Sequence, residues 1–153
     1  MDIKYIAPFL DSLVKVLSSF GINDVKRGKI SSKETMNTDK DVTSIIGIVG
    51  GFRGNVAYSF SSGTAKQLAS AMMMGMPVEQ LDSMSRSAVG ELTNMITGTA
   101  AAIFSAKGEE ILLTPPSLIF GDEIFFIISM VQTISIDMMT PAGVIEINIG
   151  LEV

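Results

Sequence analysis

The sequence contains no cysteine and no histidine, and only 18% of its residues are charged. Without cysteine there is no disulfide framework. Without both residue types the chain can build neither a Ser-His-Asp triad, nor a Cys-His pair, nor the usual zinc sites. These absences exclude most self-contained hydrolase sites.

Signatures of nucleotide and nucleic-acid binding are also missing. No GxxxxGK[ST] loop is present, and no GxGxxG lies between a strand and a helix. The formal net charge is −5, which disfavours nucleic acid. The one basic cluster, Lys26, Arg27 and Lys29 with Lys33, has no interleaved aromatics. It is more typical of a solvated strand or loop.

Long apolar runs are absent as well. Apolar residues occur in short runs such as Ile124–Ile128, far below the about 20 residues that span a bilayer. The first residues lack the basic start, apolar stretch and cleavage site of a signal peptide. We therefore expect a cytoplasmic protein without membrane insertion.

What remains is the composition of one globular domain, 47% hydrophobic over 153 residues. We expect helices at 3–20, where Pro8 either kinks the helix or marks its start, from Ser61–Thr64 to about Met74, and from Ser83 or Ser85 to about Lys107. We expect a hairpin of 42–49 and 55–60, and strands at 110–114, 123–131, 132–138 and 144–153, while 29–36 is ambiguous. These elements predict an α+β domain over 1–153, with a largely antiparallel sheet and helices packed on one face.

The last predicted strand alternates, with Ile145, Ile147 and Ile149 on one side and Glu146 and Asn148 on the other. This pattern predicts a sheet with one buried and one wet face. A long terminal strand can protect a sheet edge by pairing with another subunit, so we predict a homodimer. The methionines at 72–74 and 76 are interpreted as core filler rather than as an adaptable binding patch.

The third helix carries the most informative stretch, Ser87-Ala-Val-Gly90-Glu91-Leu-Thr-Asn94. On a helical wheel Ser87, Glu91, Asn94 and Gly98 fall in one sector of about 60°. An apolar stripe occupies the other side: Leu92, Met95, Ile96, Thr99, Ala100 and Ile103. The pattern predicts a polar platform on the exposed face of the helix.

Gly90 and Gly98 are poor helix formers, each costing roughly 1 kcal/mol against alanine. They either let a partner surface approach the backbone or accommodate a neighbouring element of the same fold. In the second case Glu91 and Asn94 are simply solvated residues, and the pattern alone favours that interpretation.

An acid and an amide could still assist chemistry on a partner that carries an activated group. An amide donates and accepts at once, and can orient an attacking water as a glutamine does in signalling GTPases. A glutamate would repel a phosphoryl group, so its sensible role is to pair with a cation of the partner.

The pattern Ser87-x-x-x-Glu91-x-x-Asn94, followed by Pro115-Pro116, resembles the signature of the CheC/CheX/FliY family of chemotaxis phosphatases. Pro116, with 21 residues between it and Asn94, is the closer match to the trailing proline of that family. Met1 to Phe20 contains no second Glu-x-x-Asn, and a single signature fits the CheX members best.

The resemblance implies an α+β fold, often dimeric, that dephosphorylates the phosphoaspartate of a CheY-like receiver domain. It implies that Asn94 orients the water and that Glu91 contacts the lysine of the receiver. Ser87, Gly90, Gly98 and Pro116 would then line the partner surface. The protein would have no cofactor or metal of its own, because the receiver supplies Mg²⁺. Two alternatives are a non-catalytic receiver-binding module and a structural dimer packed through Gly90 and Gly98.

Overall fold

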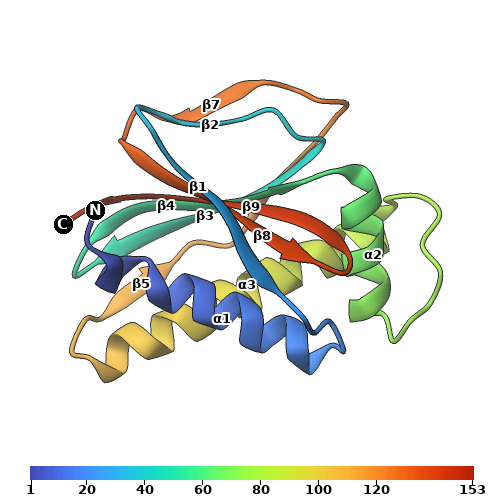
Figure 1. The fold of residues 1–153 in the computed structure, drawn as a ribbon, viewed down its shortest axis with the longest axis horizontal. Coiled ribbons are helices and arrows are strands. Elements are labelled where there is room, and N and C mark those ends of the chain that lie inside the picture. The colour runs from blue at the N-terminus through green and yellow to red at the C-terminus, as the bar shows by residue number, and fades with distance from the viewer.

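The computed structural model describes all 153 residues, and an antiparallel sheet forms the centre of the molecule (Figure 1). Its strands are β1 (Lys26–Lys33), β3 (Val42–Gly50), β4 (Arg53–Phe60), β5 (Ile111–Leu113), β6 (Ser117–Phe120), β8 (Thr133–Thr140) and β9 (Gly143–Glu152). They run in the order β1-β8-β9-β4-β3-β5, and β6 also pairs with β3. A separate pair, β2 (Met36–Thr38) and β7 (Phe126–Ser129), lies above one face.

The helices α1 and α3 lie on the opposite face of the sheet from β2 and β7, and α2 lies at one end of the sheet (Figure 1). A short 3₁₀ turn, η1 (Ile3–Tyr5), leads into α1 (Ala7–Ser19), and α2 (Ser62–Met72) and α3 (Ser83–Ala106) follow the hairpin of β3 and β4. Pro8 lies in the first turn of α1, where a missing N–H costs no helical bond, so it marks the start of the helix. The predicted α+β fold with a largely antiparallel sheet is confirmed.

The sheet face that bears β2 and β7 is not wet along β9, contrary to the prediction. Ile145, Ile147 and Ile149 point into the core as expected. On the other side, however, Asn148 is 0% exposed and Gly150 is buried. The methyl carbon of Met36 in β2 would lie 3.1 Å from a Cβ at Gly150, so the β2–β7 pair covers this face.

The position of β9 also differs from the prediction, because it lies between β8 and β4 in the middle of the sheet. The open edges are β1 on one side and the short β5 and β6 on the other. The β1 edge carries three cations, Lys26, Arg27 and Lys29, and the register of its pairing with β8 shifts between Arg27 and Ile30. Charged side chains and irregular register discourage pairing with a further strand. A homodimer stays a prediction, but β9 is not the edge that would form it.

The methionine cluster is not core filler as a whole. Met72 and Met73 are half-buried, whereas Met74 is 97% exposed and Met76 is 58% exposed. The helix α2 ends at Met72, and positive φ angles at Met74 and Gly75 turn the chain away from the core. None of the helices is both long and apolar enough to cross a membrane.

Candidate functional site

The helix that carries the predicted platform is α3, and both of its ends are well defined. Asp82 is the N-cap, because its carboxylate accepts from the N–H of Ser85 at 2.9 Å and from the Ser85 hydroxyl at 2.8 Å. These bonds lower the pKa of Asp82. The sequence analysis expected Ser83 or Ser85 as the cap, and this prediction is wrong, because the capping residue is Asp82. The helix ends at Ala106, next to the predicted Lys107, and Gly108 follows with φ +88°.

The exposed face of α3 carries the predicted side chains. Ser87, Glu91, Asn94 and Gly98 are all exposed, although Leu92 and Thr93 between them are buried. Ser87, Glu91 and Asn94 form no side-chain hydrogen bond or ion pair with any other residue of the chain. The Glu91 carboxylate and the Asn94 amide thus keep their full hydrogen-bonding capacity for a partner.

The two glycines of α3 have different surroundings. A Cβ at Gly98 would meet nothing within 4 Å, so that the backbone there is open to an approaching surface. Gly90 is buried, and a Cβ there would lie 3.3 Å from Leu118 Cδ1 and 3.8 Å from Pro116 Cγ. Gly90 therefore accommodates the segment before and within β6, which brings the half-buried Pro116 beside the turn that carries Glu91.

This placement bears on the structural-dimer interpretation. Helix-to-helix packing through both glycines would need both on one open face. Because Gly90 packs against Leu118 of the same chain, only Gly98 is open to another molecule. A second molecule could therefore approach the backbone of α3 closely at Gly98 but not at Gly90.

Three sets of contacts hold α3 in place. At its C-terminal end Phe104 packs against Phe52, with ring centroids 4.8 Å apart. Near its N-terminus the guanidinium of Arg86 lies over the Phe120 ring at 4.5 Å, and its Nε donates to the Leu81 carbonyl at 2.7 Å. In the middle, the buried hydroxyls of Thr93 and Thr97 are bonded to β3 and β4.

The sequence pattern missed these two threonines. It placed Met95, Thr99 and Ile103 on the buried stripe, but all three are only partly buried. The buried face includes Ser85, Val89, Thr93 and Thr97 at intervals of four residues. That spacing is a signal in the sequence, because residues four apart share one helix face.

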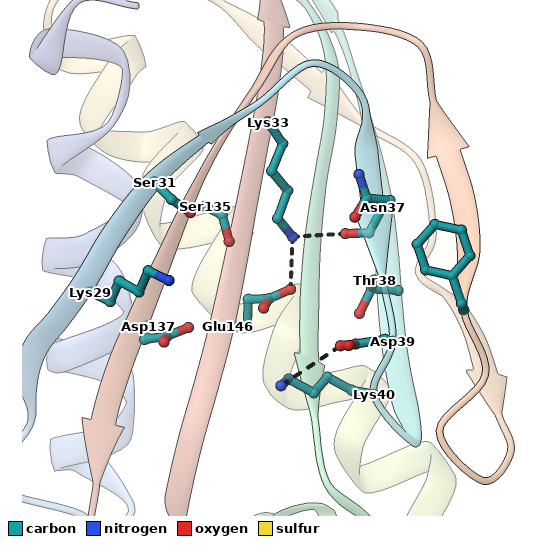
Figure 2. A pocket seen from close by; sticks show the side chains of 11 residues that line it. Lys29, Ser31, Lys33, Asn37, Thr38, Asp39, Lys40, Ser135, Asp137 and Glu146 are labelled. Carbon is teal, nitrogen blue, oxygen red and sulfur yellow. Dashed lines mark hydrogen bonds and ion pairs between the residues drawn. The ribbon is translucent and has the colours of Figure 1, made fainter.

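A polar cavity of about 350 Å³ lies on the other side of the sheet, between β1, β8 and the β2–β7 pair (Figure 2). Lys33 is at its centre and donates from Nζ to the Asn37 carbonyl at 2.9 Å, to Glu146 Oε1 at 3.3 Å and to Asn148 Oδ1 at 3.0 Å. The Lys33 side chain is 22% exposed, so it is not the solvated residue that the basic cluster predicted. Lys33 joins β1 to β2 and β9, and its role is structural.

The predicted side chains on the exposed face of α3 lie outside the five main surface cavities. Five surface cavities have volumes of 340 to 450 Å³, and Ser87, Glu91 and Asn94 line none of them. A carboxylate and an amide that stand free on an open helix can bind and orient groups of another macromolecule. The fold and this exposed pair favour the class of proteins that act on another macromolecule rather than on a small molecule held in a pocket.

Comparisons with known proteins identify the family. The family described as "Chemotaxis phosphatase CheX" matches residues 42–137. The CheY-P phosphatase CheX of Thermotoga maritima is 35% identical over 124 residues, which cover 81% of this chain and 80% of that protein. This chain belongs to the chemotaxis phosphatase CheX family.

Solved structures agree with this assignment. A chemotaxis protein CheX from Desulfovibrio desulfuricans has a TM-score of 0.86 and 30% identity, over 98% of this chain and 100% of that chain. A complex of CheX, CheY, BeF3 and Mg²⁺ from Borrelia burgdorferi has a TM-score of 0.77 and 25% identity, over 99% of this chain and 100% of that chain. Both structures match nearly the whole length of the fold described above.

Proposed function

We propose that this protein accelerates hydrolysis of the phosphoaspartate of a CheY-like receiver domain, and that Asn94 and Glu91 supply the groups it contributes. The observation that supports this function is the pair itself: an amide and a carboxylate, both exposed and without partners in the chain, on α3 of a CheX-family fold. The relative from Thermotoga maritima is a CheY-P phosphatase, and the Borrelia protein forms a complex with CheY.

Asn94 is proposed to orient the attacking water. Its amide oxygen accepts a hydrogen bond from the water while its NH₂ group can donate to a phosphoryl oxygen. The water oxygen attacks phosphorus in line, the bond from phosphorus to the aspartate oxygen breaks, and the products are the aspartate carboxylate, inorganic phosphate and a proton released to solvent. Asn94 takes no proton in this step, so its contribution is positioning.

Glu91 is proposed to hold the partner. A carboxylate one turn from Asn94 would repel the phosphoryl group if it faced it, but it attracts a lysine of the receiver. Arg86, the nearest cation along the helix, is engaged with Phe120 and Leu81. Glu91 is therefore free to form an intermolecular ion pair that sets the register of Asn94.

The rest of the proposed contact surface follows from the same face. Ser87 lies one turn before Glu91 along α3, Gly98 lies one turn after Asn94, and Pro116 lies beside the helix at Gly90. Gly90 contributes from beneath, because it lets Pro116 approach the helix. Mg²⁺ belongs to the receiver in this proposal.

The test is phosphate release from a phosphorylated receiver with and without this protein. We expect Asn94→Ala to reduce the rate by about 100-fold, the order expected for loss of a well-positioned group, while receiver binding is retained. Glu91→Ala should weaken binding instead. Asn23→Ala is the matched control, because Asn23 is an exposed asparagine outside α3 and its loss should leave the rate unchanged.

The same assay separates the alternative of a non-catalytic receiver-binding module. In that case Glu91→Ala weakens binding, but the wild-type protein never releases phosphate faster than the receiver alone. Wild-type rates in the Asn94→Ala variant would instead show that the amide has no part in the reaction.

A further inference from the structure

Beneath the exposed pair, four buried hydroxyl groups connect α3 to the sheet. The Ser44 hydroxyl of β3 lies 2.7 Å from Thr93 Oγ1, and the Tyr58 hydroxyl of β4 lies 2.8 Å from Thr97 Oγ1. None of the four residues is more than 1% exposed. Buried hydroxyls are costly when they lose their partners, so α3 cannot rotate or slide freely over these strands.

The donors of these two bonds can be assigned from the remaining contacts. The Thr93 hydroxyl donates to the Gly90 carbonyl at 3.0 Å, and the Thr97 hydroxyl donates to the Thr93 carbonyl at 2.7 Å. A threonine hydroxyl has one proton, so Ser44 and Tyr58 must donate across to the helix. Burial raises the pKa of the Tyr58 hydroxyl, which keeps it a donor throughout the physiological range.

The two backbone carbonyls that receive these bonds belong to the residues immediately before the exposed pair. Gly90 precedes Glu91, and Thr93 precedes Asn94. Each chain of hydrogen bonds therefore runs from a strand through a threonine to the turn that carries one of the two side chains. A rotation of α3 by 20° would move the tip of an exposed side chain by about 2 Å, given a helix radius of about 5 to 6 Å with side chains.

We propose that Ser44, Tyr58, Thr93 and Thr97 are positioning residues that fix the rotation of α3 and so aim Asn94 and Glu91 at the receiver. This role rests on the proposed function of the pair. A displacement of 1 Å can cost about 100-fold in rate. A rotation of even 10° would therefore reduce turnover strongly while receiver binding through the broader surface persists.

The chain contains a matched control on the same two strands. Thr43 and Ser59 are paired across β3 and β4, one register step from Ser44 and Tyr58. Their hydroxyls lie 2.8 Å apart, and both residues are buried. Successive side chains of a strand point to opposite faces, so this bond lies on the sheet face away from α3. Removing this bond also deletes a buried hydroxyl–hydroxyl hydrogen bond, but it leaves the contacts of α3 unchanged.

The experiment compares Ser44→Ala/Tyr58→Phe with Thr43→Val/Ser59→Ala. The first pair removes both donors and leaves the bonds from the threonines to the helix backbone intact. We expect its kcat for receiver dephosphorylation to fall at least tenfold with KM within about threefold of wild type. The control pair should keep both constants within twofold. Tyr58→Phe alone serves if the double variant does not fold.

A second measurement needs no receiver. Residual dipolar couplings of the α3 amides report the orientation of the helix relative to the sheet. We expect a change in Ser44→Ala/Tyr58→Phe and none in the control. Unchanged couplings in Ser44→Ala/Tyr58→Phe overturn the proposal, whatever the rate of dephosphorylation. The proposal is also overturned if this variant has changed couplings but a wild-type rate, while Asn94→Ala is inactive. Changed couplings with an active Asn94→Ala support the positioning of α3 and instead remove Asn94 from the reaction.

Discussion

At the residue scale, removing the Thr97 side of its hydrogen bond with Tyr58 should lower the free energy of unfolding more than removing the Tyr58 side. Thr97→Val leaves the buried Tyr58 hydroxyl without an acceptor, which costs about 1 to 3 kcal/mol of unfolding free energy. Tyr58→Phe removes the donor, but the Thr97 proton stays bonded to the Thr93 carbonyl, so we expect only about 0.5 to 1.5 kcal/mol. Urea unfolding of both variants measures the difference.

The double variant Tyr58→Phe/Thr97→Val completes the cycle. Because the unpaired hydroxyl is then absent, we expect it to be less destabilised than the sum of the two single variants. Additive losses would mean that the two hydroxyls are not coupled.

The exposed and the buried residues of α3 were not equally predictable. Helical periodicity identified Glu91 and Asn94, because exposure depends only on which side of the helix a residue occupies. Thr93 and Thr97 have partners 49 and 39 residues away on β3 and β4. Local periodicity does not reveal which strands pass under a helix, so the role of these two threonines became visible only in three dimensions.

At the element scale, the open backbone at Gly98 gives opposite effects on stability and on binding. A methyl group there would meet nothing within 4 Å, and alanine is favoured over glycine in helices by up to about 1 kcal/mol. We therefore expect Gly98→Ala to raise the free energy of unfolding. If the receiver approaches this backbone, the same variant should weaken receiver binding, measured by titration calorimetry.

Gly90→Ala is the comparison for this variant. Its new methyl would press on Leu118 Cδ1 at 3.3 Å, so the gain in helix propensity should be smaller than at Gly98. Equal stabilisation at both positions would contradict the difference in packing.

Local chemistry predicted several elements well and others poorly. The hairpin of β3 and β4 and the Ser61 cap of α2 follow from alternation and from capping residues. The strand β6 went unrecognised because it is short and follows two prolines. The strand β1 was ambiguous because its residues are mostly exposed, and an edge strand lacks the apolar alternation on which sequence prediction depends.

At the scale of the whole molecule, Asp41 joins three parts of the fold and makes stability depend on pH. Its carboxylate accepts from the N–H of Ser62 at 2.8 Å and of Glu123 at 2.9 Å. These bonds, with that of Ser62 the larger, lower the pKa of Asp41 below its ordinary value. A lowered folded pKa stabilises the fold above about pH 4, and this stabilisation is lost as the pH falls through the folded pKa.

Asp41→Asn should therefore be less stable than wild type at pH 7, and the gap should narrow as the pH falls below about 4. Urea unfolding across this range measures both curves. Asp11→Asn is the control, because Asp11 is exposed and should show no comparable gap. A gap that stays constant with pH would mean that the charge of Asp41 is not the cause.

The order of the strands is the part of the fold that the sequence could not predict. Alternation showed that β9 is a strand and which side chains face the core. It did not show that β8 and β4 pair with its two edges, or that Lys33 and the β2–β7 pair cover its polar side. The strand β8 is joined to β9 by a short turn, but β4 and Lys33 are far from β9 in the chain, and a local pattern does not identify such distant partners.

The central place of β9 also determines when this protein can first fold. The strand β4 ends at Phe60, and its neighbour β9 begins only at Gly143. At about 5 to 20 residues per second, a ribosome needs on the order of 5 to 20 s to synthesise the chain between them. Until β9 emerges, β4 lacks the partner strand on one of its two edges, whereas β8 is completed only just before β9. The sheet thus closes late in synthesis, because its central strand is also the last strand of the chain.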